Sequence, residues 1–393
     1  MTNILLGLLI VTNILSFGRF EFAPILYNLK FLLSLLLLFW ILANVMIKKD
    51  LLKFPSELFF LFYIWFFIIS ISLLFSFNFN ESFPIFISYL ILFILTLILL
   101  PYYMNLKEGN FHNVLKVFYW SFLIALLIIF IFGLKDGGSN YVIGDRERYQ
   151  SYFTNPNFLG LFSFGGILTS LAVYVLTKSK RYLLVIFFYT ALIYISDSRT
   201  ALFLFFLIIF LMIFSKNIIL VKNNLNIVYS IILKNIMNLT LLTLAMILII
   251  RIIVNINEFY SIANKLTSNR VFYWTIHLKQ LNIGDWFFGK GQGYMIPGIT
   301  FDNFYIKTIV ETGIFSFLIL ILILFKMLFV FYKRIFVKGY YEISEFYTLF
   351  LIMSIFIYSI FENILFSLGN SVTIFFWTYI GYQLLQEQNY EEN

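Results

Sequence analysis

The sequence predicts an all-α, polytopic integral membrane protein that forms one domain over residues 1–393. Hydrophobic residues make up 62% of the chain and charged residues only 12%, and the mean hydropathy is +0.94. Apolar runs that match the roughly 20 residues needed to cross a bilayer recur from one end to the other. A soluble chain of this length would suggest about two or three domains. The recurring runs instead predict a single membrane unit with about twelve transmembrane helices.

The expected helices lie where apolar runs are bounded by charged or turn-forming residues. The first run lacks the basic start and the small-residue cleavage site of a removable signal, so it is expected to be a membrane helix. The two helices beside Ser196–Thr200 are short and closely spaced, which predicts a membrane hairpin. In chain order, the helices are expected at residues 3–18, 31–47, 57–76, 84–102, 114–134, 158–177, 182–197, 200–215, 237–256, 304–332, 345–361 and 370–386.

Prolines are expected only in loops or at helix ends, which predicts mostly unbroken helices. The six are Pro24, Pro55, Pro84, Pro101, Pro156 and Pro297.

The orientation follows from the basic residues of the short loops, which favour the cytoplasm. These residues alternate correctly with the expected helices, so both termini should lie on the cytoplasmic side of the plasma membrane. The two long loops, residues 135–157 and 257–303, then lie outside. The basic residues assigned to the cytoplasmic side are Lys48, Lys49, Lys53, Lys107, Lys116, Lys178, Lys180, Arg181, Lys216, Lys222, Lys326, Lys333, Arg334 and Lys338.

Composition also limits the chemistry. The chain has no cysteine and only two histidines, His112 and His277, which excludes disulfides, thiolate catalysis and histidine-rich or cysteine metal centres. We therefore expect neither of these kinds of metal centre. The expected surroundings are membrane lipid, with no nucleic-acid partner.

Several basic residues break the orientation rule because they fall in the expected outer segments. An anionic ligand held at the outer face is the simplest explanation, and the planar fork of arginine suits phosphate oxygens. These residues are Arg146, Arg148, Arg199, Lys265, Arg270, Lys279 and Lys290.

Three motifs surround the outer arginines. The stretch Arg148–Asn157 ends in Asn-Pro-Asn, so Asn155 or Asn157 could simply form a turn or cap a helix. In Ser196–Arg199, at the hairpin tip, an acid and an arginine could neutralise each other. The segment Asn269–Leu281 is expected to form an amphipathic helix on the outer surface, with His277 as a solvated polar residue.

The segment Gly289–Gly313 runs from a glycine-rich loop into a membrane helix. Its start, Gly289–Gly293, resembles a nucleotide loop, but no strand precedes it, so dinucleotide binding is rejected. Asp302 either caps the helix or takes part in chemistry. Asn303, Lys307 and Glu311 share one helix face, which should look into the protein because a charge in lipid costs roughly 2.5–3.5 kcal/mol. Glu362, near the outer end of its helix, is another candidate buried acid.

The ordered set of motifs resembles the O-antigen ligase / O-antigen polymerase (Wzy-type) superfamily. The resemblance covers residues from about 140 to 365, and only the ordered set is specific. The matching pieces are R-x-x-S-x-F-x-N-P-N at Arg148–Asn157, S-x-S-R at Ser196–Arg199, R-x-x-x-W at Arg270–Trp274 before the glycine-rich loop, D-N-x-Y at Asp302–Tyr305 and E-x-G at Glu311–Gly313.

The resemblance implies a membrane glycosyltransferase that uses glycans carried on undecaprenyl pyrophosphate at the outer face of the plasma membrane. It also implies that no metal and no cofactor are needed. It implies that Arg148, Arg199 and Arg270 hold the pyrophosphate and that the outer loop before residue 304 contributes to the site. Ligases of this superfamily usually have a histidine where this chain has Asp302, so the sequence favours a polymerase of O-antigen, capsule or exopolysaccharide repeat units. A chain-length regulator and a flippase are the expected protein partners.

In this hypothesis Arg148 and Arg270 stabilise the leaving pyrophosphate and Asp302 is the base. The supporting residues are Asn157, Asn303, Lys307, Glu311 and Glu362.

Two alternatives remain. The nearer one is a ligase that transfers the glycan to another acceptor. The other is a lipid-linked oligosaccharide flippase or another transporter, a class that often has broken helices and internal repeats.

Overall fold

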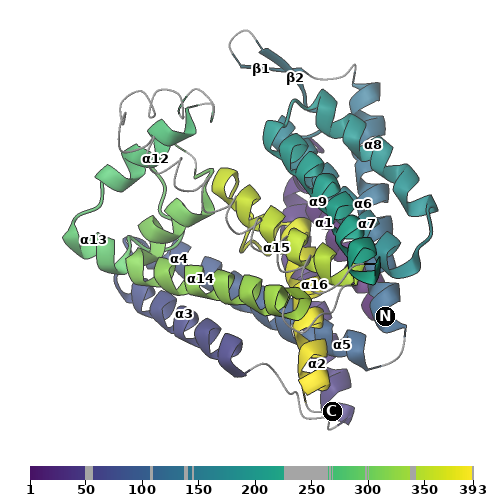
Figure 1. Ribbon diagram of the computed structural model, residues 1–393. Coiled ribbons are helices and arrows are strands. Elements are labelled where there is room, and N and C mark those ends of the chain that lie inside the picture. The colour runs from purple at the N-terminus through teal and green to yellow at the C-terminus, as the bar shows by residue number, and fades with distance from the viewer. Residues whose placement is uncertain are drawn as a thin grey trace, which may run out of the picture.

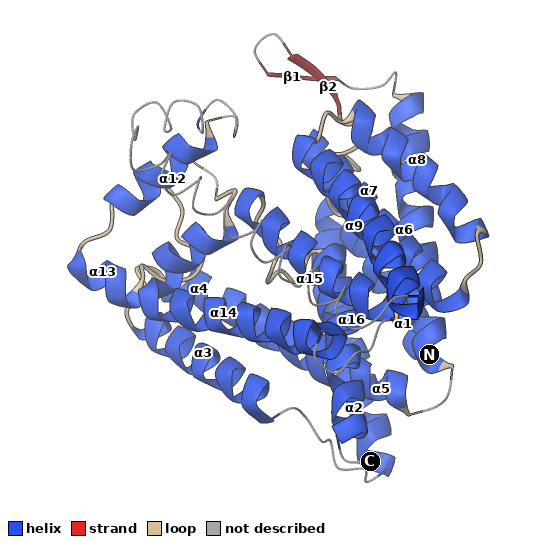
Figure 2. Ribbon diagram, in the orientation of Figure 1, coloured by secondary structure: helices blue, strands red, loops and turns tan. Residues whose placement is uncertain are grey.

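The chain is almost entirely helical in the computed structural model (Figure 2), which describes residues 1–48, 56–106, 109–136, 140–143, 146–224, 264, 267, 269–296, 299, 301–336 and 342–391. The elements are α1 (Thr2–Leu15), α2 (Ala23–Lys48), α3 (Ser56–Leu74), α4 (Phe79–Phe93), the π-helix η1 (Ile94–Leu99), α5 (Leu100–Asn105), α6 (Asn110–Lys135), β1 (Asn140–Ile143), β2 (Arg146–Tyr149), α7 (Pro156–Thr177), α8 (Arg181–Ile195), α9 (Arg199–Asn224), α12 (Arg270–Lys279), α13 (Ile283–Phe288), α14 (Phe304–Phe336), α15 (Ile343–Phe361) and α16 (Ser371–Glu391).

The all-α class is confirmed, and within the described residues seven helical segments are long and apolar enough to cross a membrane. Three shorter apolar helices accompany them, Thr2–Leu15, Arg181–Ile195 and Arg199–Ser215. The predicted helix 237–256 lies outside the described residues. The seven long segments are Ala23–Val45, Glu57–Leu74, Phe79–Asn105, Asn110–Lys135, Pro156–Thr177, Phe304–Phe336 and Ile343–Phe361.

The prediction about prolines is wrong at two positions. Pro84 lies inside α4, and Pro101 lies within the continuous helical segment Phe79–Asn105. Pro84 is the sixth residue of α4, so its missing N–H removes the hydrogen bond to the carbonyl oxygen of Asn80. Pro101 is the second residue of α5, which begins directly after the π-helical stretch η1, where the regular ladder is already interrupted. Pro55 and Pro297 are outside the described residues.

A β-hairpin interrupts the helical architecture in the segment predicted as the first outer loop. Strands β1 and β2 pair antiparallel, with Asn140 opposite Tyr149 and Tyr141 opposite Arg148. The sequence between the strands is Gly-Asp, a two-residue combination that is typical of tight hairpins. The loop prediction missed this signal, and the hairpin matters because it carries Arg148.

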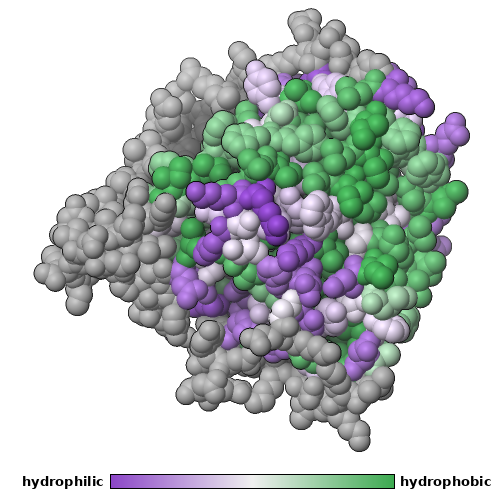
Figure 3. Space-filling model, turned by 90° about the vertical axis from the view of Figure 1, so that its right-hand side faces the viewer, coloured by the Kyte–Doolittle hydropathy of each residue, from purple (hydrophilic) through white to green (hydrophobic). Residues whose placement is uncertain are grey.

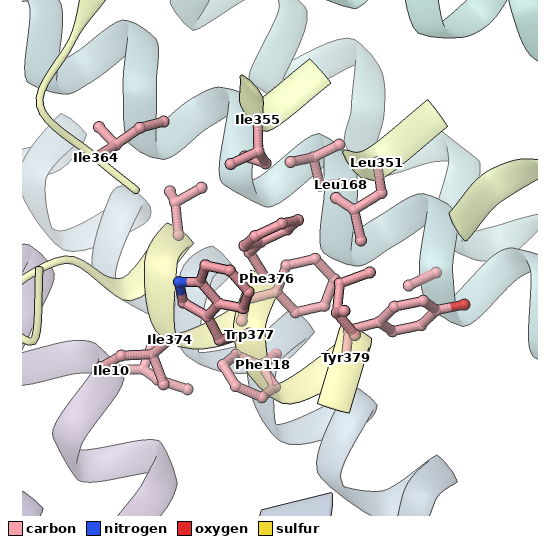
Figure 4. Close-up of a cluster of buried hydrophobic side chains, with 14 of the residues drawn as sticks. Ile10, Phe118, Leu168, Leu351, Ile355, Ile364, Ile374, Phe376, Trp377 and Tyr379 are labelled. Atoms are coloured by element: carbon pink, nitrogen blue, oxygen red, sulfur yellow. The ribbon is translucent and has the colours of Figure 1, made fainter. Parts of the chain in front are cut away.

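The hydrophobic core surrounds α16, which contacts α1, η1, α5, α7 and α15. Figure 4 shows Trp377, Phe376 and Phe118 among the side chains of this core, and the rings of Trp377 and Phe376 lie 4.8 Å apart between centroids. The indole N–H of Trp377 donates to the carbonyl oxygen of Leu365 at 2.6 Å, so the large ring is buried with its one polar atom paired.

The two ends of the molecule differ. Both termini lie in the lower half of Figure 1, whereas the β1–β2 hairpin and α12 lie at the top. Seen from the right of that view, broad apolar areas cover the surface, with hydrophilic side chains gathered between them (Figure 3). Large apolar residues such as Phe187, Phe203 and Phe210 are exposed on α8 and α9, as suits contact with lipid.

Candidate functional site

Arg148 joins the first two predicted motifs. From β2, its Nε donates to the carbonyl oxygen of Ser196 at 3.0 Å. One terminal nitrogen donates to Oδ1 of Asn157 at 2.9 Å and to the carbonyl oxygen of Asp197 at 3.3 Å. The two asparagines of Asn-Pro-Asn therefore have different roles. Asn155 caps α7 by accepting the N–H of Asn157, whereas Asn157 also orients the arginine.

The hairpin between α8 and α9 approaches α7 very closely. A Cβ atom at Gly160 would lie 2.3 Å from Cβ of Ser198, so only glycine allows this contact. Arg199 opens α9 with an exposed side chain, and it forms no hydrogen bond or ion pair with the residues that the structure describes. The suggested Asp197–Arg199 neutralisation is thus not found there. Of Arg148, Arg199 and Arg270, Arg199 is the one whose side chain is most exposed and therefore most open to a ligand.

Arg270 holds three separate segments together. At the start of α12, its guanidinium donates to the carbonyl oxygen of Phe361 at 2.5 Å and to Oε1 of Glu362 at 2.9 Å. Its Nε lies 3.5 Å from Oδ2 of Asp302. One arginine thus sits between a carboxylate that follows α15 and one that precedes α14.

The residues around Arg148 and those around Arg270 are close enough to affect each other's charge. Burial is the main cause that lowers the pKa of Arg148; the charge of Asp197 raises that pKa, and the charges of Arg270 and Arg199 lower it. The pKa of Glu362 is raised to about 7, mainly by burial and in part by the charge of Asp302, while the charge of Arg270 opposes the rise. We refer to Arg148, Arg199, Arg270, Asp302 and Glu362 together as the arginine site.

Asn303, and not Asp302, caps α14. Its Oδ1 accepts the backbone N–H groups of Tyr305 at 2.8 Å and of Ile306 at 2.9 Å, as expected of a residue that precedes the first helical turn. This overturns the alternative in which Asp302 is a helix cap. Asp302 lies beside Arg270 instead.

Substitutions at these neighbouring residues should therefore differ in their effect. Asn303→Ala is expected to lower the free energy of unfolding by about 1 kcal/mol because α14 loses its cap. Asp302→Asn is expected to change it by about 0.5 kcal/mol or less, since the ion pair is partly exposed. Thermal unfolding of both variants in detergent checks this; a larger loss for Asp302→Asn would restore the capping role to Asp302.

Lys307 and Glu311 face the protein interior, as predicted, and they hold the glycine loop Gly289–Gly293. Nζ of Lys307 lies 3.7 Å from Oε1 of Glu311, whose side chain is only 3% exposed. The same Oε1 accepts the N–H of Gly293 at 2.8 Å. Glu311 thus holds the loop directly, whereas Lys307 pairs with Glu311 and hydrogen-bonds the side chain of Tyr89 in α4, so it supports the loop through Glu311.

Gly313 creates the acceptors for that loop. Its φ of 83° and ψ of 171° break α14, a conformation that is essentially restricted to glycine. The carbonyl oxygens of Val310 and Glu311 accept the N–H groups of Lys290 at 2.8 Å and Gly291 at 3.0 Å. The expectation of unbroken helices is therefore also wrong for α14.

His277 is not solvated, contrary to the prediction. It is 1% exposed and stacks on Phe301, with 3.8 Å between the ring centroids. The apolar ring that covers it comes from the far end of the same outer segment, so the helical pattern of α12 alone could not reveal the contact.

Two basic residues were missed by the sequence reading. Nε of Arg19 donates to the carbonyl oxygen of Phe153 at 2.9 Å, which joins the α1–α2 turn to the segment before α7. Lys30 is 2% exposed inside α2, with Nζ 3.7 Å from the ring centroid of Tyr27. Both positions carried a signal, since Arg19 also breaks the orientation rule and Lys30 interrupts an apolar run.

In the described part of the chain, no three histidine, aspartate or glutamate residues gather in a way that could hold a metal ion. Lys265, predicted among the outer basic residues, lies outside the described residues. Comparison with protein-family models and with curated proteins finds no match for this chain, so the function of the arginine site is argued from its own residues.

Proposed function

We propose that this protein polymerises surface-polysaccharide repeat units, such as those of O-antigen, capsule or exopolysaccharide. Its substrates would be glycans carried on undecaprenyl pyrophosphate at the outer side of the plasma membrane. The observation that carries the proposal is the arginine site, in which three arginines from separate segments gather with two carboxylates at one end of an apolar helical bundle. This combination suits the departure of a pyrophosphate and the uptake of a proton.

In the proposed reaction, a sugar hydroxyl of one lipid-linked unit attacks the anomeric carbon of another glycan. The bond from that carbon to the pyrophosphate breaks, and the pyrophosphate leaves with the bonding electrons. Arg199, which is open, and Arg148 hold the phosphate oxygens, while Arg270 stabilises the charge that develops.

The hydroxyl proton passes to a carboxylate beside Arg270. The sequence favoured Asp302, but Glu362 suits this task better because burial raises its pKa to about 7, close to the working pH of an efficient base. We therefore assign Glu362 as the base, with Asp302 orienting Arg270 from the other side.

The proposed topology places both termini in the cytoplasm and the arginine site outside, with a flippase and a chain-length regulator as partners. The separation of the termini from β1–β2 and α12 supports it (Figure 1). The breaks at η1 and Gly313 weaken one argument against a transporter, which often has broken helices. The gathering of arginines at one end still favours an enzyme, with a ligase as the nearer alternative.

Deletion of the gene in its own host tests the proposal. We expect long chains to disappear while single repeat units remain displayed or lipid-linked at the outer face. A ligase would instead leave long polymer on the lipid carrier without reaching its acceptor. A flippase would leave the lipid-linked units on the inner leaflet, and either result would overturn the assignment.

The rate should also depend on pH through Glu362. Its pKa of about 7 lies above the ordinary 4.5, so the carboxyl is mostly protonated below pH 7 and ionised above it. Polymer formation by membranes is thus expected to rise with pH through about 7, and Glu362→Gln should lose this dependence together with about 10²–10⁴-fold of the rate. A Glu362→Gln variant with the unchanged pH profile would assign the base elsewhere.

The same pKa shift makes the stability of the folded protein fall with rising pH, whereas the rate of polymer formation rises. Between about pH 4.5 and 7 the folded chain holds the proton that the unfolded chain releases, so the contribution of Glu362 to stability falls as the pH rises through this window.

A further inference from the structure

A cavity with polar and apolar walls lies beside the glycine loop, on the segment that connects Arg270 to Asp302. It has a volume of about 310 Å³, at the small end of the range for small-molecule sites. Its walls come from the α3–α4 connection, the first turn of α4, and the glycine loop with the residues after it. The lining residues are Phe77, Asn78, Glu81, Ser82, Lys290, Gln292, Gly293, Tyr294 and Met295.

Gln292 is the unusual member of this lining. It is 1% exposed, yet neither the oxygen nor the nitrogen of its side-chain amide has a hydrogen-bond partner among the described residues. Buried amides are nearly always paired, because leaving them unpaired is costly. An unpaired amide in the wall of a cavity therefore points to a ligand that supplies both a donor and an acceptor.

The cavity is fixed in place and is not a gap between loose loops. Oγ of Ser82 donates to the carbonyl oxygen of Gln292 at 2.6 Å, and the N–H of Phe77 donates to the carbonyl oxygen of Lys290 at 2.9 Å. A Cβ atom at Gly291 would lie 2.3 Å from Cβ of Ser76, so the two walls touch directly. Glu311 holds the loop from the other side through Gly293.

The charges of the lining argue against an anionic ligand. Nζ of Lys290 lies 3.7 Å from Oδ2 of Asp285, and Glu81 adds a carboxylate to the wall. Phosphate would meet no unbalanced cation here. A sugar hydroxyl both donates and accepts hydrogen bonds, which matches the amides of Gln292 and Asn78 and the carboxylate of Glu81. Phe77, which is 87% exposed, adds an aromatic surface against which the C–H face of a sugar can pack.

We infer that this cavity is a saccharide subsite that binds one neutral sugar residue of the glycan. The inference rests on the proposed polymerase function for its biological meaning. It separates recognition of the glycan, at Gln292, from recognition of the pyrophosphate, at the arginine site.

The test uses the whole protein in detergent micelles and a probe without phosphate. The probe is the oligosaccharide released by mild acid from the lipid carriers of the deletion strain, and binding is followed by saturation-transfer NMR. We expect the wild-type protein to bind and Gln292→Met, a substitution of similar size, to weaken binding about tenfold or more. Gln386→Met is the matched control, since this glutamine lies in another cavity, between α6, α7, α15 and α16.

Asn78→Ala provides a second variant, because this exposed residue lines the cavity and its truncation should leave folding intact. Equal binding by the wild-type protein and both cavity variants, or no binding by the wild-type protein, would overturn the subsite.

The outcome is separable from that of the proposed function. Arg270→Ala should lose polymer and keep oligosaccharide binding. If deletion removes long chains but the purified protein does not bind the probe, the polymerase stands and the subsite falls. If the probe binds through Gln292 but deletion leaves the surface glycans unchanged, the subsite stands and the polymerase falls.

Discussion

Arg270→Ala is expected to lower the rate of polymer formation by about 10²–10³-fold, the usual effect of removing one preorganised charge from a transition state. The variant loses the group that lies between Asp302 and Glu362, so two neighbouring carboxylates are left without their shared cation. Arg270→Lys should recover only part of the rate, because an ammonium group cannot reproduce the planar fork that reaches both carboxylates and the carbonyl oxygen of Phe361.

The measurement is the chain-length distribution of surface glycan after complementation of the deletion strain, with the amount of protein in the membrane determined in parallel. Arg181→Ala is the matched control, since Arg181 is an exposed arginine at the end of α8 opposite the Ser196–Arg199 hairpin. We expect this control to retain long chains. Arg270→Ala cells with wild-type chain lengths would remove Arg270 from the mechanism.

Gly313→Ala is expected to have the largest effect on the fold. A Cβ atom there would lie 2.0 Å from the carbonyl oxygen of Phe287, and the backbone φ of 83° is one that alanine rarely adopts. Strain of this kind costs about 1–3 kcal/mol before the clash is added. The glycine loop should separate from α14, which would move Asp302 away from Arg270 and abolish polymer.

Thermal unfolding in detergent checks this expectation. The matched control is Gly284→Ala in α13, where the nearest atom to an added Cβ is Oδ1 of Asn282 at 3.4 Å. We expect a clearly lower unfolding temperature for Gly313→Ala and a near-normal one for Gly284→Ala. If both variants melt like the wild-type protein, the break in α14 is not required for the fold.

Most of the helical framework could be predicted because its signal is local. A long apolar run such as Asn110–Lys135 is helical and apolar whatever packs against it. The break at Gly313 could not be predicted in this way, since it depends on Phe287 and Lys290, which approach from a different segment. The same reason explains His277, whose burial is caused by Phe301 and not by the pattern of its own helix.

The candidate site could be predicted only in part. The outer arginines were recognised because each of them, taken alone, breaks the rule that basic residues favour the cytoplasmic side of a membrane protein. Their partners were not, because Arg148 is bound by the carbonyl oxygen of Ser196 and Arg270 by that of Phe361. A backbone carbonyl has no residue signature, so contacts of this kind become visible only once the chain is folded.

The central position of α16 has a consequence for biosynthesis. Every helix that surrounds α16 is made before it, because α1, η1, α5, α7 and α15 all precede it in the chain. Until α16 emerges, these helices are inserted around a centre that lacks Trp377 and its neighbours. The bundle is therefore completed from the inside by its last described helix, and a nascent chain halted before Ser371 would present the membrane quality-control machinery with an unfilled core.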